Sequence, residues 1–203
     1  MAEEAPVVRQ WAQAAMDGDQ AAFGNLVEYY QHAVYNLAYR LLGDPQEAED
    51  AAQEAFLRAY ANLTRYDLER SFKTWLLSIT SNHCIDRLRK RRLTWLSIDD
   101  DEEPVPPIAL ASQEAGPEEA FDQGERSANI QALLAQIQPE YRTVLVLRYW
   151  YDMSYTEIAE ALNTTESAVK SRLFRARQAV AGLLGPSASP VSTQAMWPAM
   201  EGS

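Results

Sequence analysis

The fold is decided by the stretch at residues 154–177, which reads SYTEIAEALNTTESAVKSRLFRAR. Ser154 followed by Glu157 forms a capping-box pattern, in which two side chains bond reciprocally to backbone N–H groups at the start of a helix. The helix that begins there ends at Asn163-Thr164-Thr165, because Asn tolerates the left-handed backbone of a tight turn. A second, longer helix is predicted to begin near Glu166.

The second of these helices has two distinct faces. At about 100° per residue, one narrow arc carries the apolar side chains of Val169, Leu173, Ala176 and Val180. These are expected to pack on the first helix at Ile158, Ala159 and Leu162. The opposite, basic side consists of Ser167, Lys170, Ser171, Phe174, Arg175 and Gln178, flanked by Arg172 and Arg177.

Two short helices joined by a tight turn, the second of them basic, form a helix-turn-helix. The basic face fits a major groove, where Arg reads guanine and an aromatic ring contacts a thymine methyl. Arg172 and Arg177 would more naturally meet phosphates. The alternative is a basic amphipathic helix whose polar face is only solvated. The motif alone predicts a DNA-binding protein and does not define its class.

The chain as a whole is acidic, with a net charge of -11 over 203 residues, which by itself argues against nucleic-acid binding. Its basic residues are nevertheless concentrated at 87–92 and 170–177, and its acids at 99–103. Charges act locally, because salt screens them within ~10 Å. Two basic patches separated by an acidic connector are therefore compatible with DNA binding.

Composition also excludes several classes of site. The one cysteine, Cys84, cannot form an internal disulfide, and we expect a small, half-buried thiol. Only two histidines are present, and no Gly-rich phosphate loop, metal-ligand cluster or nucleophile triad is visible, so we expect no metal, no cofactor and no enzyme. An acidic N-terminus and the lack of an apolar run of ~18 residues predict a cytoplasmic protein without membrane insertion.

Helical periodicity predicts an all-α fold of two small domains joined by an acidic flexible linker. After an N-terminal segment, 1–18, the first domain covers 19–92. Its expected helices begin at a cap on Asp19, at Pro45 after Gly43-Asp44, and after Ser71.

The remaining boundaries follow from composition. The stretch 93–127 is rich in acids and proline and is predicted to be the linker; the alternative is an ordered loop. Helical patterning returns over 128–184, with a stripe from Ile130 to Ile137 and a helix opened by Pro139. The tail, 185–203, is expected to be mobile.

One face of the third helix carries four notable side chains: Trp75, Asn82, Asp86 and Arg89. An aromatic ring, an amide and an arginine on one stripe suit contacts to unpaired bases and phosphates during DNA strand opening. The alternative is that Trp75 belongs to the core and that Asp86 with Arg89 is a surface ion pair.

Three segments, in order, resemble motifs of the extracytoplasmic-function (ECF) group of RNA polymerase sigma factors. The segment 50–60, DAAQEAFLRAY, is similar to their polymerase-binding helix, and 72–79, FKTWLLSI, with the basic residues that follow, to the helix that recognises and melts the −10 element. The segment 154–177 resembles their −35-reading motif. The resemblance covers Asp17 to Leu184 and implies a sigma-2 domain at 19–92 and a sigma-4 domain at 128–184.

The resemblance implies promoter-specific transcription initiation, with core RNA polymerase (its β′ coiled coil and β flap), promoter DNA and an anti-sigma factor as partners. The implied core-binding residues are Asp50, Gln53, Glu54, Phe56 and Leu57; the alternative for Phe56 and Leu57 is the core. The implied −10 residues are Tyr66, Trp75, Asn82, Asp86, Arg89, Lys90, Arg91 and Arg92, with the loop 66–71 capturing a flipped base. The implied −35 residues are Ser167, Lys170, Ser171, Arg172, Phe174, Arg175 and Arg177.

Two departures from the family pattern concern the −35 motif. Asn163 stands where Gly is common, and Glu166 would repel phosphate if it pointed outward. A stand-alone helix-turn-helix regulator is the main alternative function, but it leaves the N-terminal helices without a role. A scaffold for protein interactions is another.

Overall fold

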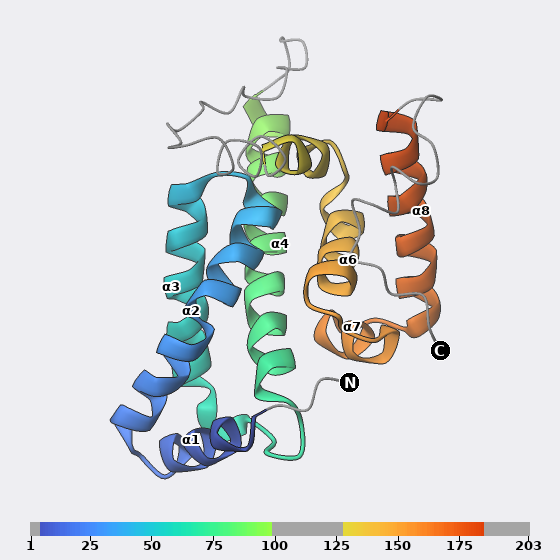
Figure 1. Cartoon of the computed structure of the whole chain (residues 1–203). Coiled ribbons are helices and arrows are strands. Elements are labelled where there is room, and N and C mark those ends of the chain that lie inside the picture. Colours follow the sequence, from blue (N-terminus) through green and yellow to red (C-terminus); the bar gives the residue numbers. More distant parts are fainter. Residues whose placement is uncertain (1–4, 99–127, 185–203) are drawn as a thin grey trace, which may run out of the picture.

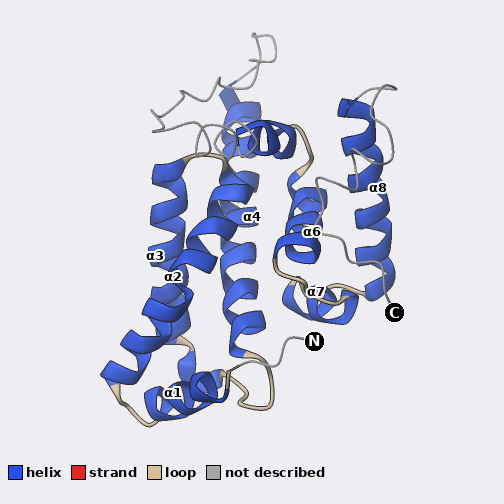
Figure 2. Cartoon of the chain, viewed as in Figure 1, coloured by secondary structure: helices blue, strands red, loops and turns tan. Residues whose placement is uncertain are grey.

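The structure is a computed structural model and describes residues 5–98 and 128–184. All regular secondary structure in these two ranges is helical, as Figure 2 shows, which confirms the all-α prediction. Residues 99–127 of the expected linker and the whole expected tail lie outside the described residues. No helix within the described ranges is long and apolar enough to cross a membrane.

The N-terminal part of the chain contains four α-helices (Figure 1): α1 Pro6–Met16, α2 Gln20–Leu42, α3 Pro45–Ala61 and α4 Phe72–Ile98. A short 3-10 helix, Leu63–Arg65, follows α3. The predicted helix boundaries at α2 are confirmed. The Asp19 side chain accepts hydrogen bonds from the first N–H groups of α2, and Gly43 closes the helix in the left-handed conformation, at φ 86°. Helix α1 was not singled out from the sequence, although its small apolar residues are buried against α2.

Helix α4 is longer than expected, because it continues to Ile98 instead of ending at Arg92. The residues between Arg92 and Pro104 include no proline or glycine. Nothing local therefore stops the helix at the place where we set the start of the linker.

The C-terminal part contains a helix over 128–135, then α6 Pro139–Trp150, α7 Tyr155–Ala161 and α8 Glu166–Leu184. Both hydrogen bonds of the predicted capping box are present at the start of α7. Asn163 adopts a positive φ of 48° in the turn, as expected for a residue that replaces glycine. The buried residues of α8 are the four predicted from its period: Val169, Leu173, Ala176 and Val180.

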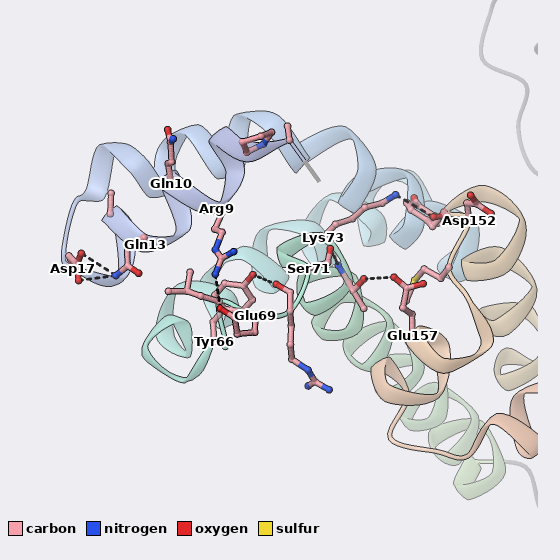
Figure 3. Close-up of a pocket in the computed structure, with 18 residues that line it drawn as sticks. Arg9, Gln10, Gln13, Asp17, Tyr66, Glu69, Ser71, Lys73, Asp152 and Glu157 are labelled. Atoms are coloured by element: carbon pink, nitrogen blue, oxygen red, sulfur yellow. Dashed lines mark hydrogen bonds and ion pairs between the residues drawn. The ribbon is translucent and has the colours of Figure 1, made fainter. Parts of the chain in front are cut away.

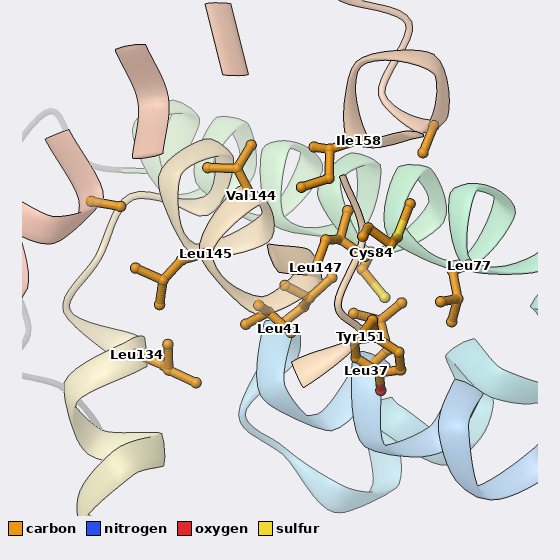
Figure 4. Packing of buried hydrophobic residues seen from close by; sticks show 14 of the residues in the cluster. Leu37, Leu41, Leu77, Cys84, Leu134, Val144, Leu145, Leu147, Tyr151 and Ile158 are labelled. Carbon is orange, nitrogen blue, oxygen red and sulfur yellow. The ribbon is translucent and has the colours of Figure 1, made fainter. Parts of the chain in front are cut away.

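The two parts of the chain share a hydrophobic core. Leu37, Leu41 and Leu77 of the N-terminal helices lie in one buried cluster with Leu145, Leu147 and Ile158 of the C-terminal helices (Figure 4). A second cluster lies among α1–α4 alone. Cys84 is fully buried in the shared core, not half-buried as predicted, and burial raises the pKa of its thiol to about 12.

Polar side chains from the C-terminal helices also cap the end of α2. The last carbonyls of any helix lack partners within it. The Gln131 side chain donates to the carbonyl of Tyr39 at 2.9 Å, and the guanidinium of Arg142 donates to the carbonyl of Leu41. The two parts are therefore joined by specific hydrogen bonds as well as by apolar packing.

Candidate nucleic-acid interface

Helix α8 lies at one edge of the molecule, with α6 between it and α4 (Figure 1). Exposed among its predicted −35 residues are Ser167, Lys170, Ser171, Phe174, Arg175 and Arg177, and Arg172 is half-buried. Phe174 is unusual among them, because its apolar ring is 61% exposed on a face that also carries Lys170 and Arg175. The structure therefore brings the predicted −35 residues together on one accessible helix face.

Glu166, the acidic residue at the start of this helix, is held by its neighbours. The Thr156 hydroxyl donates to one carboxylate oxygen of Glu166 at 2.7 Å, and the Lys170 ammonium lies 3.9 Å from the other. These contacts partly offset its negative charge, which reduces the repulsion of DNA phosphate that the sequence suggested.

The two aromatic residues of the predicted −10 set, Tyr66 and Trp75, are less exposed. Trp75 is half-buried, and its ring centroid lies 5.0 Å from that of Tyr66 and 5.5 Å from that of Phe72. Tyr66 is only 5% exposed, and its hydroxyl donates to the carbonyl of Arg70. Tyr66, which the resemblance implies as a −10 contact, is therefore buried here and supports Trp75 from the core.

Further along α4, the predicted −10 residues meet the C-terminal helices. The Asn82 amide donates to the carbonyl of Ala161 at 3.0 Å. The Arg89 guanidinium lies 3.6 Å from the carboxylate of Glu140. The remaining predicted side chains of this set that the structure describes, Asp86, Lys90 and Arg91, are exposed, and Arg92 lies on the same helix.

The loop before α4 borders a groove between the two parts of the chain. The groove has a volume of about 1260 Å³ and is lined by α1, by residues 66–74 and by residues 151–157 (Figure 3). The Arg70 guanidinium lies 2.8 Å from Glu160, and the Lys73 ammonium donates to the carbonyl of Tyr151 at 3.3 Å. The predicted base-capturing loop thus contacts α7 through Arg70, and the first turn of α4 contacts the segment before α7 through Lys73.

The predicted polymerase-binding surface lies on α3. Leu57 is 66% exposed, so the alternative that it belongs to the core is wrong, whereas Phe56 is partly buried against the N-terminal core. The Arg58 side chain donates to Glu54 at 2.7 Å, and this bond lowers the pKa of Glu54. Asp50 and Gln53 are exposed.

Tyr60 also belongs to this surface, although the sequence analysis did not single it out. It is 49% exposed and packs edge-to-face on Phe23, with ring centroids 4.9 Å apart. The signal was its position three residues after Leu57, because such residues are neighbours on a helix surface.

Comparison with known proteins agrees with this organisation. The family model "Sigma-70 region 2" matches residues 26–94, and "Sigma-70, region 4" matches residues 127–180. The chain is 41% identical to the ECF RNA polymerase sigma factor SigW of Bacillus subtilis over 167 residues, which is 80% of this chain and 89% of SigW. It is 35% identical to the RNA polymerase sigma-H factor of Pseudomonas aeruginosa, over 88% of this chain and 94% of that protein.

A solved structure has the same arrangement of helices. It is that of CnrH in complex with the cytosolic domain of CnrY, with a TM-score of 0.64 and 26% identity, covering 89% of this chain and 99% of CnrH. A second, RpoE of Bartonella quintana in complex with the anti-sigma factor NepR, has a TM-score of 0.63 at 22% identity, over 81% of this chain and 98% of RpoE, and supports the fold.

Proposed function

This chain belongs to the ECF RNA polymerase sigma factors, and from that premise we propose how its residues divide the recognition of a promoter. It binds core RNA polymerase and directs promoter-specific transcription initiation. It is a DNA-binding initiation factor, and we infer that it performs no catalysis of its own and works in the cytoplasm, where its promoters are. A stand-alone helix-turn-helix regulator would leave the region 2 match at 26–94 without a role.

Helix α8 reads the −35 element in this proposal. The main support for this proposal is the accessible face of α8. Phe174 and Arg175, which are consecutive in sequence, are both exposed there, and Ser167, Lys170 and Ser171 are exposed on the same side of the helix. Arg175 supplies the fixed fork of donors that suits guanine, and Phe174 the apolar contact that suits a thymine methyl. Arg172 and Arg177 contact the phosphates beside them.

Helix α4 and the loop before it engage the −10 element. Trp75 is the stacking group, and the rings of Tyr66 and Phe72 support it. Asn82 contacts Ala161, and Arg89 contacts Glu140. These contacts must break before Asn82 and Arg89 can bind DNA. Promoter binding along the whole of α4 therefore requires the C-terminal helices to move away from it.

The remaining partners are proteins. The exposed surface of α3 that includes Leu57 is the site for the β′ coiled coil of the polymerase, and the C-terminal domain is the site for the β flap. CnrH and the Bartonella RpoE are solved with CnrY and with the anti-sigma factor NepR. By this likeness we propose that an anti-sigma factor holds this chain inactive as well.

The test of the whole proposal is transcription with purified core polymerase, with and without the full chain, on a promoter library. Transcripts that start at defined sites only when the chain is present support the sigma role and identify both promoter elements. Core binding without any promoter-dependent transcript would contradict it.

Arg175→Ala is expected to weaken use of the −35 element selectively. Loss of a bidentate contact to a base costs about 1–3 kcal/mol, or about 5- to 150-fold in discrimination at that base pair. The measurement is competition between promoters that differ at single −35 positions. Arg9→Ala, which removes an exposed arginine on α1, is the matched control; uniform weakening on all promoters would exclude a base-reading role for Arg175.

Trp75→Ala is expected to slow promoter opening about 5- to 150-fold, because base stacking on an aromatic ring contributes about 1–3 kcal/mol, while core affinity stays unchanged. Permanganate reactivity of unpaired thymines reports opening, and a binding titration reports core affinity. Trp75→Phe keeps an aromatic ring against Tyr66 and should retain most of the activity. An equal loss of opening and of core binding would indicate a folding defect instead.

A further inference from the structure

Helix α6 contacts α8 through two tyrosine–arginine pairs. The Arg175 guanidinium donates from Nη1 to the hydroxyl of Tyr141 at 2.9 Å. The Arg177 guanidinium donates from Nε to the hydroxyl of Tyr149 at 2.8 Å. The two guanidinium carbons lie 6.0 and 5.7 Å from the centroids of the respective rings, within the range of cation–π attraction.

The pairs lie on either side of the buried ridge of α8. Arg175 and Arg177 flank Ala176, which is fully buried, and adjacent helical side chains point about 100° apart. Tyr141 and Tyr149 lie two turns apart on α6, about 12 Å along its axis at 1.5 Å per residue. Helix α6 packs against α8. Tyr141, near the start of α6, contacts Arg175 on one side of the buried ridge, and Tyr149, near the end of α6, contacts Arg177 on the other side.

Each bond leaves a different edge of the guanidinium for a ligand. Arg175 uses Nη1 toward Tyr141, so the edge formed by Nε and Nη2 is not engaged in this bond and presents two parallel donors, as guanine O6 and N7 require. Arg177 uses Nε toward Tyr149, so its terminal Nη1 and Nη2 can face a phosphate. The two pairs thus match the base-reading and phosphate-contacting roles of the two arginines.

Fixing these side chains in advance has an energetic consequence. An exposed arginine loses much of its large rotamer entropy when it is immobilised at an interface. Tyr141 and Tyr149 are themselves half-buried on α6, so packing restricts the positions of their hydroxyls. A guanidinium that already bonds to such a hydroxyl has less freedom to lose when DNA binds.

We propose that Tyr141 and Tyr149 are positioning residues for promoter recognition. Tyr141 orients Arg175 toward a base edge of the −35 element, and Tyr149 orients Arg177 toward a neighbouring phosphate. This inference rests on the proposed function of α8 and extends it to the preceding helix α6. Neither tyrosine belongs to the helix-turn-helix sequence itself.

The test uses Tyr141→Phe and Tyr149→Phe in the full chain bound to core polymerase. Each substitution removes one hydroxyl and keeps the ring. Promoter affinity is measured on the preferred −35 sequence and on each single-base variant. Tyr141→Phe is expected to reduce discrimination by about fivefold, the effect of one hydrogen bond, at the base that Arg175→Ala identifies and nowhere else. Tyr149→Phe should lower affinity by a similar factor on all sequences.

Two controls separate positioning from stability. Tyr29→Phe removes a hydroxyl from a 54% exposed tyrosine on α2 and should change nothing. In an Arg175→Ala background, Tyr141→Phe should have no further effect, because the hydroxyl acts through that arginine. Discrimination is a ratio of affinities, so a smaller fraction of folded protein does not alter it.

The outcomes are distinct. Unchanged discrimination in Tyr141→Phe, with a clear loss in Arg175→Ala, would overturn the positioning role and leave the proposed function intact. Tighter binding by Tyr141→Phe would overturn it too, because the hydroxyl would then compete with DNA for Arg175. If Arg175→Ala itself loses no discrimination, the proposed role of α8 fails first, and the role of Tyr141 fails with it.

Discussion

Replacing Leu57 by alanine is expected to lower affinity for core RNA polymerase by about 30-fold or more, the effect of losing an interface residue that contributes about 2 kcal/mol. Leu57 is 66% exposed on α3, so its truncation leaves no cavity in the core. It lies beside the exposed ring of Tyr60 and the charge pair of Glu54 with Arg58. An apolar centre with a polar rim is typical of a protein-binding surface.

The measurement is a titration of labelled core polymerase with the wild-type and variant chains. Val7→Ala, which truncates an exposed apolar side chain on α1, is the matched control and should bind core normally. Both variants should unfold at the same temperature as the wild type. Unchanged core affinity in Leu57→Ala would exclude this part of α3 from the polymerase interface.

Replacing Arg142 by methionine is expected to lower the free energy of unfolding by about 3 kcal/mol. The Arg142 guanidinium is buried and donates to the carbonyls of Leu41, Ala135 and Ile137. Methionine keeps much of the apolar stem but leaves these carbonyls without their donor. Since one carbonyl belongs to α2 and the other two to the segment before α6, the loss should loosen the contact between the two parts of the chain.

Burial lowers the pKa of Arg142 to about 10, from an ordinary value of 12.5. A cationic group whose pKa is lower in the folded state binds fewer protons there, so the cost of burying its charge is fully present below pH ~10 and is relieved only as the pH rises through that value. The difference between wild type and Arg142→Met should therefore be constant from pH 6 to pH 8.

Urea denaturation of the full chain measures this difference. Arg148→Met is the matched control on the same helix, because Arg148 is half-buried and bonds within the C-terminal part, to the carbonyl of Met153. It should cost about 1 kcal/mol or less. If the two substitutions lowered the free energy of unfolding equally, the hydrogen bonds from Arg142 to Leu41, Ala135 and Ile137 would contribute no more to stability than the bond from Arg148 to Met153.

The local structure of this protein follows from residues that are close together in the sequence. Asp19, Gly43 and the Ser154–Glu157 capping box set helix boundaries through bonds within a few residues, and the buried stripe of α8 follows from its period. Such features depend on neighbours along the chain, so a single sequence is enough to predict them. The same period identified the accessible face of α8 as the candidate site for DNA.

Which helix faces meet depends instead on contacts between residues that are far apart in the sequence. The bond from Arg142 to Leu41 joins residues 101 positions apart, and that from Arg175 to Tyr141 joins residues 34 apart. An apolar stripe or an arginine in the sequence indicates that some other part of the chain packs against it. It does not identify that part, because many helix faces have similar chemistry and volume. The shared core, the capping of α2 and the tyrosine partners of the recognition helix therefore became visible only when the helices were packed together.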